Sequence, residues 1–299
     1  APVAIGAMSL QALHIEENEA GSRLDRVVCE RLSLSRAQAK RLFEAGEVRR
    51  NGRRAGKGDI VAAGDHVELG SELSDPSALP DERPELSVLF EDEWFVVVDK
   101  PAAMPSHPLR PGELGCAANW LVHAYPEMAG IGYDSRQPGL VNRLDNDTTG
   151  ILWAARTAQA FEAARELMES GAVQKRYVAL THRAVEPQSI DLALAPSPKH
   201  RSRVEVSPLG RPSHTQVLRS VRHGACFCVE LEAHRAYRHQ VRAHLAAVSA
   251  PIAGDTLYGG MPASRHFLHA QSLSFRHPFT GAEVHVEAPR PDDWADAAD

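Results

Sequence analysis

Residues 139–155 read GLVNRLDNDTTGILWAA, a stretch in which two apolar runs flank a short polar one. The polar run places Arg143, Asp145 and Asp147 between segments that are typical of buried strands. Charges that enter an otherwise apolar sheet are expensive unless they have a use. The pattern therefore predicts a strand, a tight polar turn and a second strand, with Asp145 raised at a sheet edge or a cleft floor.

The same loop also has a simpler interpretation. Asp and Asn are common turn formers, and Asp147, Thr148 and Thr149 can cap a turn by bonds from side chain to backbone. Arg143 favours the functional interpretation. An ionised Asp near an Arg keeps a low pKa and stays available as a nucleophile or an electrostatic stabiliser.

The bulk composition is that of an ordinary soluble protein, with 299 residues of which 43% are hydrophobic and 24% charged. No apolar run approaches the roughly 18 residues of a membrane helix, and the N-terminal stretch lacks the pattern of a secretory signal. The four cysteines suggest neither a disulfide framework nor a zinc cluster, and the 15 histidines show no HExxH spacing. We expect reduced thiols, a cytoplasmic location, no membrane partner and no metal.

The net charge of −6 argues weakly against a nucleic-acid partner, but it hides a local excess. Between Arg36 and Lys57 there are eight basic residues and only two acidic ones, Glu44 and Glu47. The distribution of charge matters more than its total for phosphate binding, so this segment is a candidate RNA-binding surface.

The chain divides into four parts in this interpretation: a flexible lead-in (1–20), a small domain (21–70), a linker rich in proline and acidic residues (71–86) and a larger domain (87–295). In the small domain, Ser35 and Gln38 form the capping box of a helix that Gly46 ends. A hairpin with an Asn51-Gly52 turn follows the helix.

Strand signals dominate the larger domain. Helices are predicted at 113–124, 157–168 and 238–248. Strands are predicted on both sides of an acidic turn in 86–100, and at 173–183, 214–222, 225–233 and twice within 266–289. Long strands with interspersed helices, not in strict βαβ alternation, favour an α+β fold whose mixed, largely antiparallel sheet is flanked by helices.

Five segments of this domain resemble, in order, the motifs of the RluA family of pseudouridine synthases. The first segment, NRLDNDTTGILWAART (142–157), contains Asp145. It resembles the family's signature loop, whose Arg-Leu-Asp core supplies the single catalytic aspartate. The other four are FVVVDKPAAMPSHP (95–108), KRYVALTHR (175–183) with its Lys-x-Tyr, RHQVRAHLAAVSAPIAGDTLYGG (238–260) and HFLHAQSLSFRHP (266–278). Residues 22–69 resemble the small αL-type RNA-binding domain named for ribosomal protein S-four.

The resemblance implies an RNA pseudouridine synthase, which breaks the N1–C1′ bond of a uridine, turns the base and rejoins it through C5. No cofactor is required. The family's roles imply a catalytic Asp145 and a Tyr177 that stacks on the uracil or helps to remove the C5 proton, after base flipping. Expected substrate-binding residues are Arg143, Arg238, His239 and Arg242. Expected RNA-binding residues are Arg36, Lys40, Arg41, Arg49, Arg50 and Arg53.

Two positions depart from the family's pattern. Asn142 stands where the family usually has His, and Tyr237 stands where it usually has an arginine that pairs with the catalytic aspartate. We therefore expect Arg235 or Arg238 to supply the missing charge. Arg235 is preferred as a catalytic residue because it shares the strand parity of Tyr237.

The expected partner is RNA, and the chain is expected to be a monomer. Large-subunit ribosomal RNA is favoured over transfer RNA, because the basic N-terminal domain accompanies the ribosomal members more often. Two other functions remain open. One is a catalytically inactive RNA-binding or ribosome-assembly protein on the same fold, which Tyr237 favours. The other is a glycosidase with Asp145 and Asp147 as carboxylates within the roughly 5–10 Å that such enzymes use.

Overall fold

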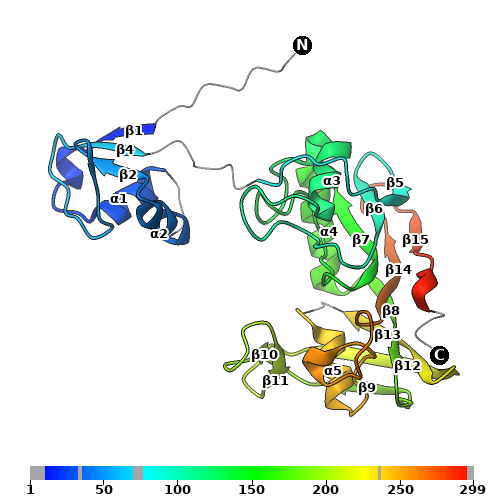
Figure 1. Cartoon of the computed structure of the whole chain (residues 1–299). Helices are drawn as coiled ribbons and strands as arrows, with labels where there is room; N and C mark the ends of the chain where they lie inside the picture. Colours follow the sequence, from blue (N-terminus) through cyan, green and yellow to red (C-terminus); the bar gives the residue numbers. More distant parts are fainter. Residues whose placement is uncertain (1–10, 33–35, 70–76, 235–236, 295–299) are drawn as a thin grey trace. The chain divides into compact units, whose positions relative to one another are not determined.

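The computed structural model describes residues 11–32, 36–69, 77–234 and 237–294 (Figure 1). The chain separates into two compact units, Ala1–Asp75 and Pro76–Asp299, and each is considered by itself. In the described ranges no helix is both long and apolar enough to cross a membrane.

The smaller unit is an antiparallel sheet covered by two helices. Its order is β1-β4-β2-β3. The helix α2 ends at Gly46, whose φ of 77° is left-handed, and the hairpin turn has φ of 51° at Asn51 and 76° at Gly52, as a type I′ turn requires. The predicted cap, Ser35, lies outside the described residues. The elements are β1 (Gln11–His14), η1 (Glu17–Glu19), α1 (Leu24–Arg31), α2 (Arg36–Ala45), β2 (Val48–Arg50), β3 (Arg53–Arg54) and β4 (His66–Leu69).

The larger unit is built on one long sheet of order β5-β6-β7-β14-β8-β13-β12-β9, with β15 added on β14. Its strands pair antiparallel except for β7 and β14, which are parallel. The predicted α+β fold with a mixed, largely antiparallel sheet is confirmed. Its strands are β5 (Ser87–Glu91), β6 (Phe95–Lys100), β7 (Thr149–Ala155), β8 (Gln174–Thr181), β9 (Gln188–Asp191), β12 (His214–His223), β13 (Cys226–His234), β14 (Leu268–Arg276) and β15 (Glu283–Glu287).

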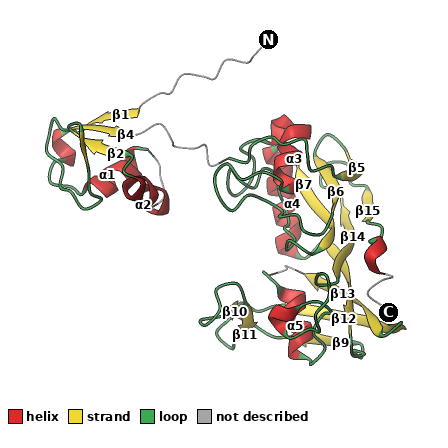
Figure 2. Ribbon diagram, in the orientation of Figure 1, coloured by secondary structure: helices red, strands yellow, loops and turns green. Residues whose placement is uncertain are grey.

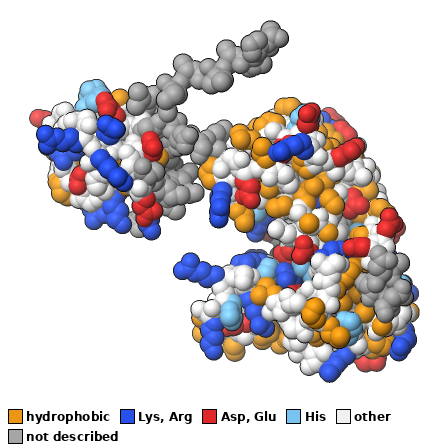
Figure 3. Space-filling view, viewed as in Figure 1, with side chains coloured by type: hydrophobic (Ala, Val, Ile, Leu, Met, Phe, Trp, Pro, Cys, Tyr) orange, Lys and Arg blue, Asp and Glu red, His pale blue; other side chains and the backbone are white. Residues whose placement is uncertain are grey.

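Helices cover the two halves of this sheet separately (Figure 2). α3 and α4 lie beside β7, whereas α5 lies beside β12 and the small hairpin β10–β11. Figure 3 shows the surface hollowed between the halves, with acidic and basic side chains side by side. The remaining elements are α3 (Ala117–Ala124), η2 (Pro126–Met128), α4 (Ala158–Ser170), β10 (Leu194–Pro196), β11 (Val204–Val206), α5 (Gln240–Ala247), η3 (Thr256–Tyr258) and η4 (Asp292–Trp294).

The second half of the predicted linker belongs to the larger unit. The backbone N–H of Ala78 donates to the carbonyl of Ser135, and that of Asp81 donates to the carbonyl of Asn119. Leu86 is buried in the core of this unit. The prolines and acidic residues of 77–86 are typical of a linker. The buried side chains of Ala78 and Leu86 nevertheless pack in the core of the larger unit.

Two predicted helices begin later than expected. The first begins at Ala117, because the Glu113 carboxylate accepts from the backbone N–H of Leu109 and Arg110 and closes a separate turn. The other begins at Gln240, because His239 has a left-handed φ of 54° that cannot continue an α-helix.

Of the two strands expected around Asp145, only the second forms. Residues before the loop run along β7 through an isolated bridge between Leu140 and Ala154. The Asn142 side chain then takes the place of a backbone ladder. Its Oδ1 accepts from Trp153 N at 2.7 Å, and its Nδ2 donates to Ile151 O at 3.2 Å. The backbone is thereby free to leave the sheet at Arg143, and the expected first strand is replaced by an extended arm.

Candidate active site

The loop that carries Asp145 is fixed from beneath by the segment that follows β6. The backbone N–H of Leu144 donates to Ser106 Oγ at 2.9 Å, and the Ser106 hydroxyl donates to Leu144 O at 2.7 Å. The ammonium of Lys100 is fully buried and donates to the carbonyl of Asn146 at 2.9 Å, and also to the carbonyls of Pro101 and Met104. These bonds hold the loop on both sides of Asp145.

Among the residues that the structure describes, one arginine holds the carboxylate of Asp145. Its Oδ2 accepts from Arg242 Nη1 at 2.7 Å, and His239 Nε2 lies 3.6 Å from its Oδ1. Burial raises the pKa of Asp145, but the attraction of His239 and Arg242 outweighs it and the pKa lies below its ordinary value. Burial lowers the pKa of His239 itself to about 4, so the lasting positive charge beside Asp145 at neutral pH is that of Arg242.

Arg242 is itself anchored by a second carboxylate. Its Nε and Nη2 donate to Asp255 at 2.7 and 2.9 Å, and both side chains are almost fully buried. The guanidinium also lies over the ring of Tyr258, 5.2 Å from its centroid. Although burial opposes it, the bonds to Asp255 and Asp145 hold the pKa of Arg242 above its ordinary value. A permanently charged, immobile arginine thus faces Asp145.

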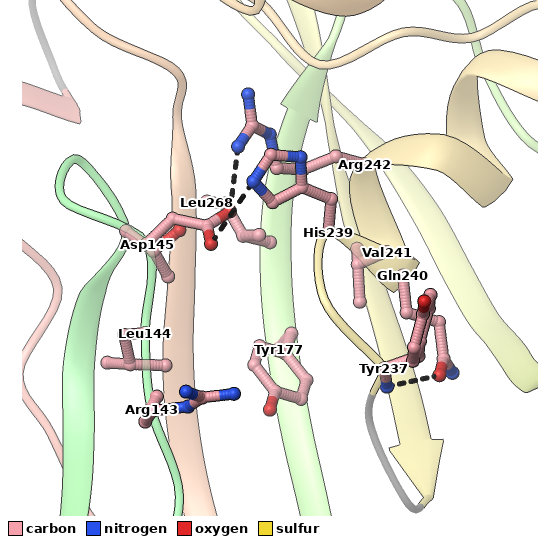
Figure 4. Close-up of a pocket in the computed structure, with 11 residues that line it drawn as sticks. Arg143, Leu144, Asp145, Tyr177, Tyr237, His239, Gln240, Val241, Arg242 and Leu268 are labelled. Carbon is pink, nitrogen blue, oxygen red and sulfur yellow. Dashed lines mark hydrogen bonds and ion pairs between the residues drawn. The ribbon is translucent and has the colours of Figure 1, made fainter. Parts of the chain in front are cut away.

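These groups surround one pocket, shown in Figure 4. Asp145, His239 and Arg242 converge at one end, and the ring of Tyr177 lies on the β8 wall below them. Burial raises the pKa of Tyr177 to about 12, with a further contribution from Asp145. The full lining is Arg143, Leu144, Asp145, Thr148, Tyr177, Tyr237, His239, Gln240, Val241, Arg242 and Leu268.

The structure therefore brings together five of the seven residues predicted for catalysis and substrate binding: Asp145, Tyr177, Arg143, His239 and Arg242. Arg143 does not pair with Asp145. It is exposed at the pocket, with Nη1 at 3.5 Å from Gln137 Oε1.

The expected replacement for the family arginine is not Arg238. Its guanidinium donates to the carbonyls of Arg201 and Ser202 at 3.3 and 2.8 Å, and Arg238 is not among the residues that line the pocket. Arg235 lies outside the described residues. Among the described residues the cation beside Asp145 is Arg242, four positions after Arg238, so Tyr237 at the usual arginine position does not leave Asp145 without a cation.

Further polar residues support the loop and were absent from the predicted site. His266 Nε2 lies 2.8 Å from the Thr148 hydroxyl. Arg265 donates to the carbonyl of Asp147 and pairs with Asp293. His266 begins the segment 266–278 that resembles a family motif, and Arg265 comes directly before it. Polar residues in or beside such a segment could have been predicted as part of the site.

The predicted RNA-binding residues of the smaller unit differ in their surroundings. Arg49 and Arg53 are exposed, whereas Arg50 pairs with Asp65 at 2.6 Å and Lys40 lies 3.5 Å from Glu44. Arg36 and Arg41 belong to α2. In the part of the chain that the structure describes, no group of His, Cys, Asp and Glu is placed to hold a metal ion.

Comparison with known proteins gives consistent results. A family model described as RNA pseudouridylate synthase matches residues 94–247, and one described as S4 domain matches residues 22–67. The chain is 33% identical to ribosomal large subunit pseudouridine synthase D of Xylella fastidiosa, over 93% of this chain and 88% of that protein. It is 31% identical to the protein of the same name from Xanthomonas campestris, over 95% and 90%.

Solved structures agree with the fold. Human RNA pseudouridylate synthase domain containing 1 superposes with a TM-score of 0.58 at 23% identity, covering 74% of this chain and 89% of that one. Human RNA pseudouridylate synthase domain containing 4 gives 0.53 at 21% identity, over 71% and 91%.

Proposed function

This chain belongs to the RNA pseudouridylate synthase family, and we propose that it isomerises uridine to pseudouridine in large-subunit ribosomal RNA with Asp145 as its catalytic carboxylate. The observation that carries the proposal is the ion pair of Asp145 and Arg242 at the end of a pocket whose wall is Tyr177. An ionised carboxylate held in place beside a buried cation is equipped to act as a nucleophile or a base.

The reaction needs a group that acts on the ribose while the glycosidic bond breaks. Asp145 fits this task because Arg242 keeps it ionised and fixes its Oδ2, while Oδ1 faces the neutral ring of His239. The carboxylate either attacks the sugar or removes a proton from it, and both alternatives use the same geometry. A uridine stacked in RNA cannot reach this carboxylate, so the nucleotide flips into the pocket.

Tyr177 is suited to hold the detached base. Its ring forms a wall of the pocket close to Asp145, and its raised pKa keeps the phenol protonated at neutral pH. An aromatic face stacks on a nucleobase, and a phenol can exchange a proton with the base that it holds. Arg143, exposed at the same pocket, is placed to meet a backbone phosphate.

The choice of ribosomal RNA rests on the relatives and on the smaller unit. The similar proteins are named for the large ribosomal subunit, and the basic hairpin β2–β3 adds exposed arginines that favour phosphate binding. Cytoplasmic action as a monomer is part of the same proposal. Transfer RNA remains the alternative substrate, since the pocket's contacts act on a single nucleotide.

The test is to incubate the purified protein with ribosomal RNA from cells that lack the gene and to map pseudouridine in the product. We expect new pseudouridine with the wild type and none with Asp145→Asn. Asp147→Asn is the matched control, because this carboxylate is 43% exposed two residues away and lies 4.0 Å from His266. Equal activity of the wild type and Asp145→Asn would reject the catalytic assignment. Product on transfer RNA alone would reject the substrate.

A catalytically inactive RNA-binding protein is the second candidate, favoured by Tyr237 at the usual arginine position. It predicts RNA binding without product on any RNA from the deletion cells. The intact pair of Asp145 and Arg242 argues for activity. The glycosidase alternative gains no support, because Asp147 is not among the residues that line the pocket.

A further inference from the structure

A buried lysine stands behind the pocket and has no part in the mechanism above. Lys175 lies in β8 and is 5% exposed. Within the described residues its ammonium forms no hydrogen bond or ion pair and keeps a small contact with solvent, and burial of the side chain lowers its pKa to about 8. Burying an amino group without a counter-charge is costly, and an apolar side chain of the same size would suit the position better. Lys175 therefore costs the fold stability, which suggests that the residue has a functional role.

Lys175 shares a cavity with Tyr177. Both residues line a small second cavity, together with Asn142 and Ser272, and Tyr177 alone among these four also lines the pocket that holds Asp145. The second cavity has room for about one water molecule. The side chain of Tyr177 is therefore shared by the pocket that holds Asp145 and by the cavity that Lys175 lines.

The strand geometry brings the two side chains to the same side. Residues two apart on a strand face the same way, and their Cα atoms lie roughly 7 Å apart, a distance that a lysine side chain spans. In Figure 4 the hydroxyl of Tyr177 points back toward the start of β8, the end at which Lys175 lies. The other charged or titratable groups that line the two cavities are Arg143, Asp145, Arg176, Tyr237, His239 and Arg242.

We propose that Lys175 is the proton partner of Tyr177 during pseudouridine formation; the inference rests on the proposed function. Once the C1′–C5 bond has formed, C5 still carries its hydrogen, which must leave for the uracil ring to regain its conjugation. A protonated phenol cannot accept that hydrogen. Its proton first passes to Lys175 in the molecules whose amine is neutral, a form that a pKa of about 8 makes accessible near neutral pH. The transfer is direct or runs through one water, and it leaves a phenolate beside an ammonium.

The phenolate then takes the proton from C5, and the electron pair of the C5–H bond returns to the ring. The phenol is restored, the ammonium of Lys175 releases its proton to solvent, and N1 of the detached base acquires one. One proton is lost at C5 and one gained at N1, so the step balances without an external reagent. Lys175 acts through Tyr177 and does not touch the base.

The test uses the full-length protein and RNA carrying either hydrogen or deuterium at C5 of the target uridine. For Lys175→Met we expect kcat to fall about 100-fold with KM within about twofold, since proton transfer by a positioned group contributes about that much. The deuterium isotope effect should become larger than that of the wild type, because removal of the C5 proton now limits the rate. Tyr177→Phe should behave alike, and the double variant should be no slower than the slower single one.

Arg219→Met is the matched control, an exposed cation on β12 paired with Glu230. It should leave both kcat and the isotope effect unchanged. Lys175→Met should unfold at the same temperature as the wild type or higher, because an unpaired buried amine has been removed. If Met does not fold, Lys175→Gln carries the same expectations.

A kcat within about threefold of the wild type would overturn the proposal. So would a slower variant whose isotope effect is no larger than that of the wild type, because a general distortion of the site slows every step. A wild type that makes no pseudouridine from any RNA rejects the proposed function instead, and the two failures are thereby distinguished.

Discussion

Arg242 donates to Asp145 at 2.7 Å and at the same time holds Asp255 with its other two nitrogens, so one buried guanidinium serves two carboxylates. Removing it would leave Asp255 buried and unpaired and would take the fixed charge away from Asp145. The arginine therefore has a structural role and, under the proposed function, a chemical one, and a single substitution interrupts both.

Arg242→Gln should lower the free energy of unfolding by about 3–5 kcal/mol, the usual cost of breaking a buried ion pair. Activity should fall about 100-fold or more, since a misplaced catalytic group costs about that much. Urea unfolding and steady-state kinetics measure the two effects. Arg238→Gln is the comparison for stability and should cost less than about 1 kcal/mol, because it loses only bonds to two exposed carbonyls. A similar loss in both variants would contradict the assignment.

Stability should fall as the pH drops from about 6.5 to about 4. Burial lowers the pKa values of His239, His266 and His269 to about 4, against an ordinary value of 6.5. Between these limits the unfolded chain binds protons that the folded chain does not, so protonation favours unfolding. Denaturant unfolding at several pH values measures the slope.

His269→Gln should make that slope shallower, whereas His223→Gln, an exposed residue of β12, should leave it unchanged. A flat profile between pH 6.5 and 4 in the wild type would show that these rings are not held neutral by the fold.

Asn142→Ala should destabilise the larger unit by about 1–3 kcal/mol and reduce activity. The change leaves Trp153 N and Ile151 O without the partner that joins them to the loop. Asn146→Ala provides the control, because this side chain lies in the same loop and is exposed. Thermal unfolding compares the two, and equal stability of both variants would argue that the Asn142 side chain does not anchor the loop.

Arg49→Gln combined with Arg53→Gln should weaken RNA binding and reduce the slope of log affinity against log salt by about one per lost phosphate contact. Both arginines are exposed on the basic hairpin. Arg50→Gln should have a smaller effect, since Asp65 already neutralises its charge at 2.6 Å. Filter binding over a range of salt concentrations measures these slopes. Identical slopes for the wild type and all variants would show that the hairpin does not contact RNA.

Local patterns in the sequence predicted most of the fold. The Asn51-Gly52 turn and the left-handed Gly46 follow from residue types with narrow backbone preferences, so they are legible without any tertiary information. The prediction of a strand directly before Asp145 was wrong because the side chain of Asn142, and not its backbone, bonds to the neighbouring strand. The spacing of apolar residues does not reveal such a bond. The docking of residues 77–86 depends in the same way on contacts with distant parts of the chain.

The sequence predicted most of the residues that line the pocket, but not which of them form ion pairs with one another. Asp145 and Tyr177 stand in segments that identify them, and Arg242 was expected at the site as a substrate-binding residue. Its partner could not be read from the chain, because the bond to Asp145 joins residues 97 positions apart. The left-handed φ at His239, directly before the helix that carries Arg242, could not be predicted from the sequence either.

The residues that support Asp145 lie far from it in the sequence, and this affects the order in which the site forms during synthesis. Its loop is completed by Lys100 and Ser106 before it in the chain, and by Arg242 and His266 long after it. β14, the neighbour of β7, comes later in the chain than every other strand of this sheet except β15. Contacts of such long range form late in folding. A nascent chain therefore carries the basic hairpin β2–β3 well before the loop of Asp145 has all of its supports.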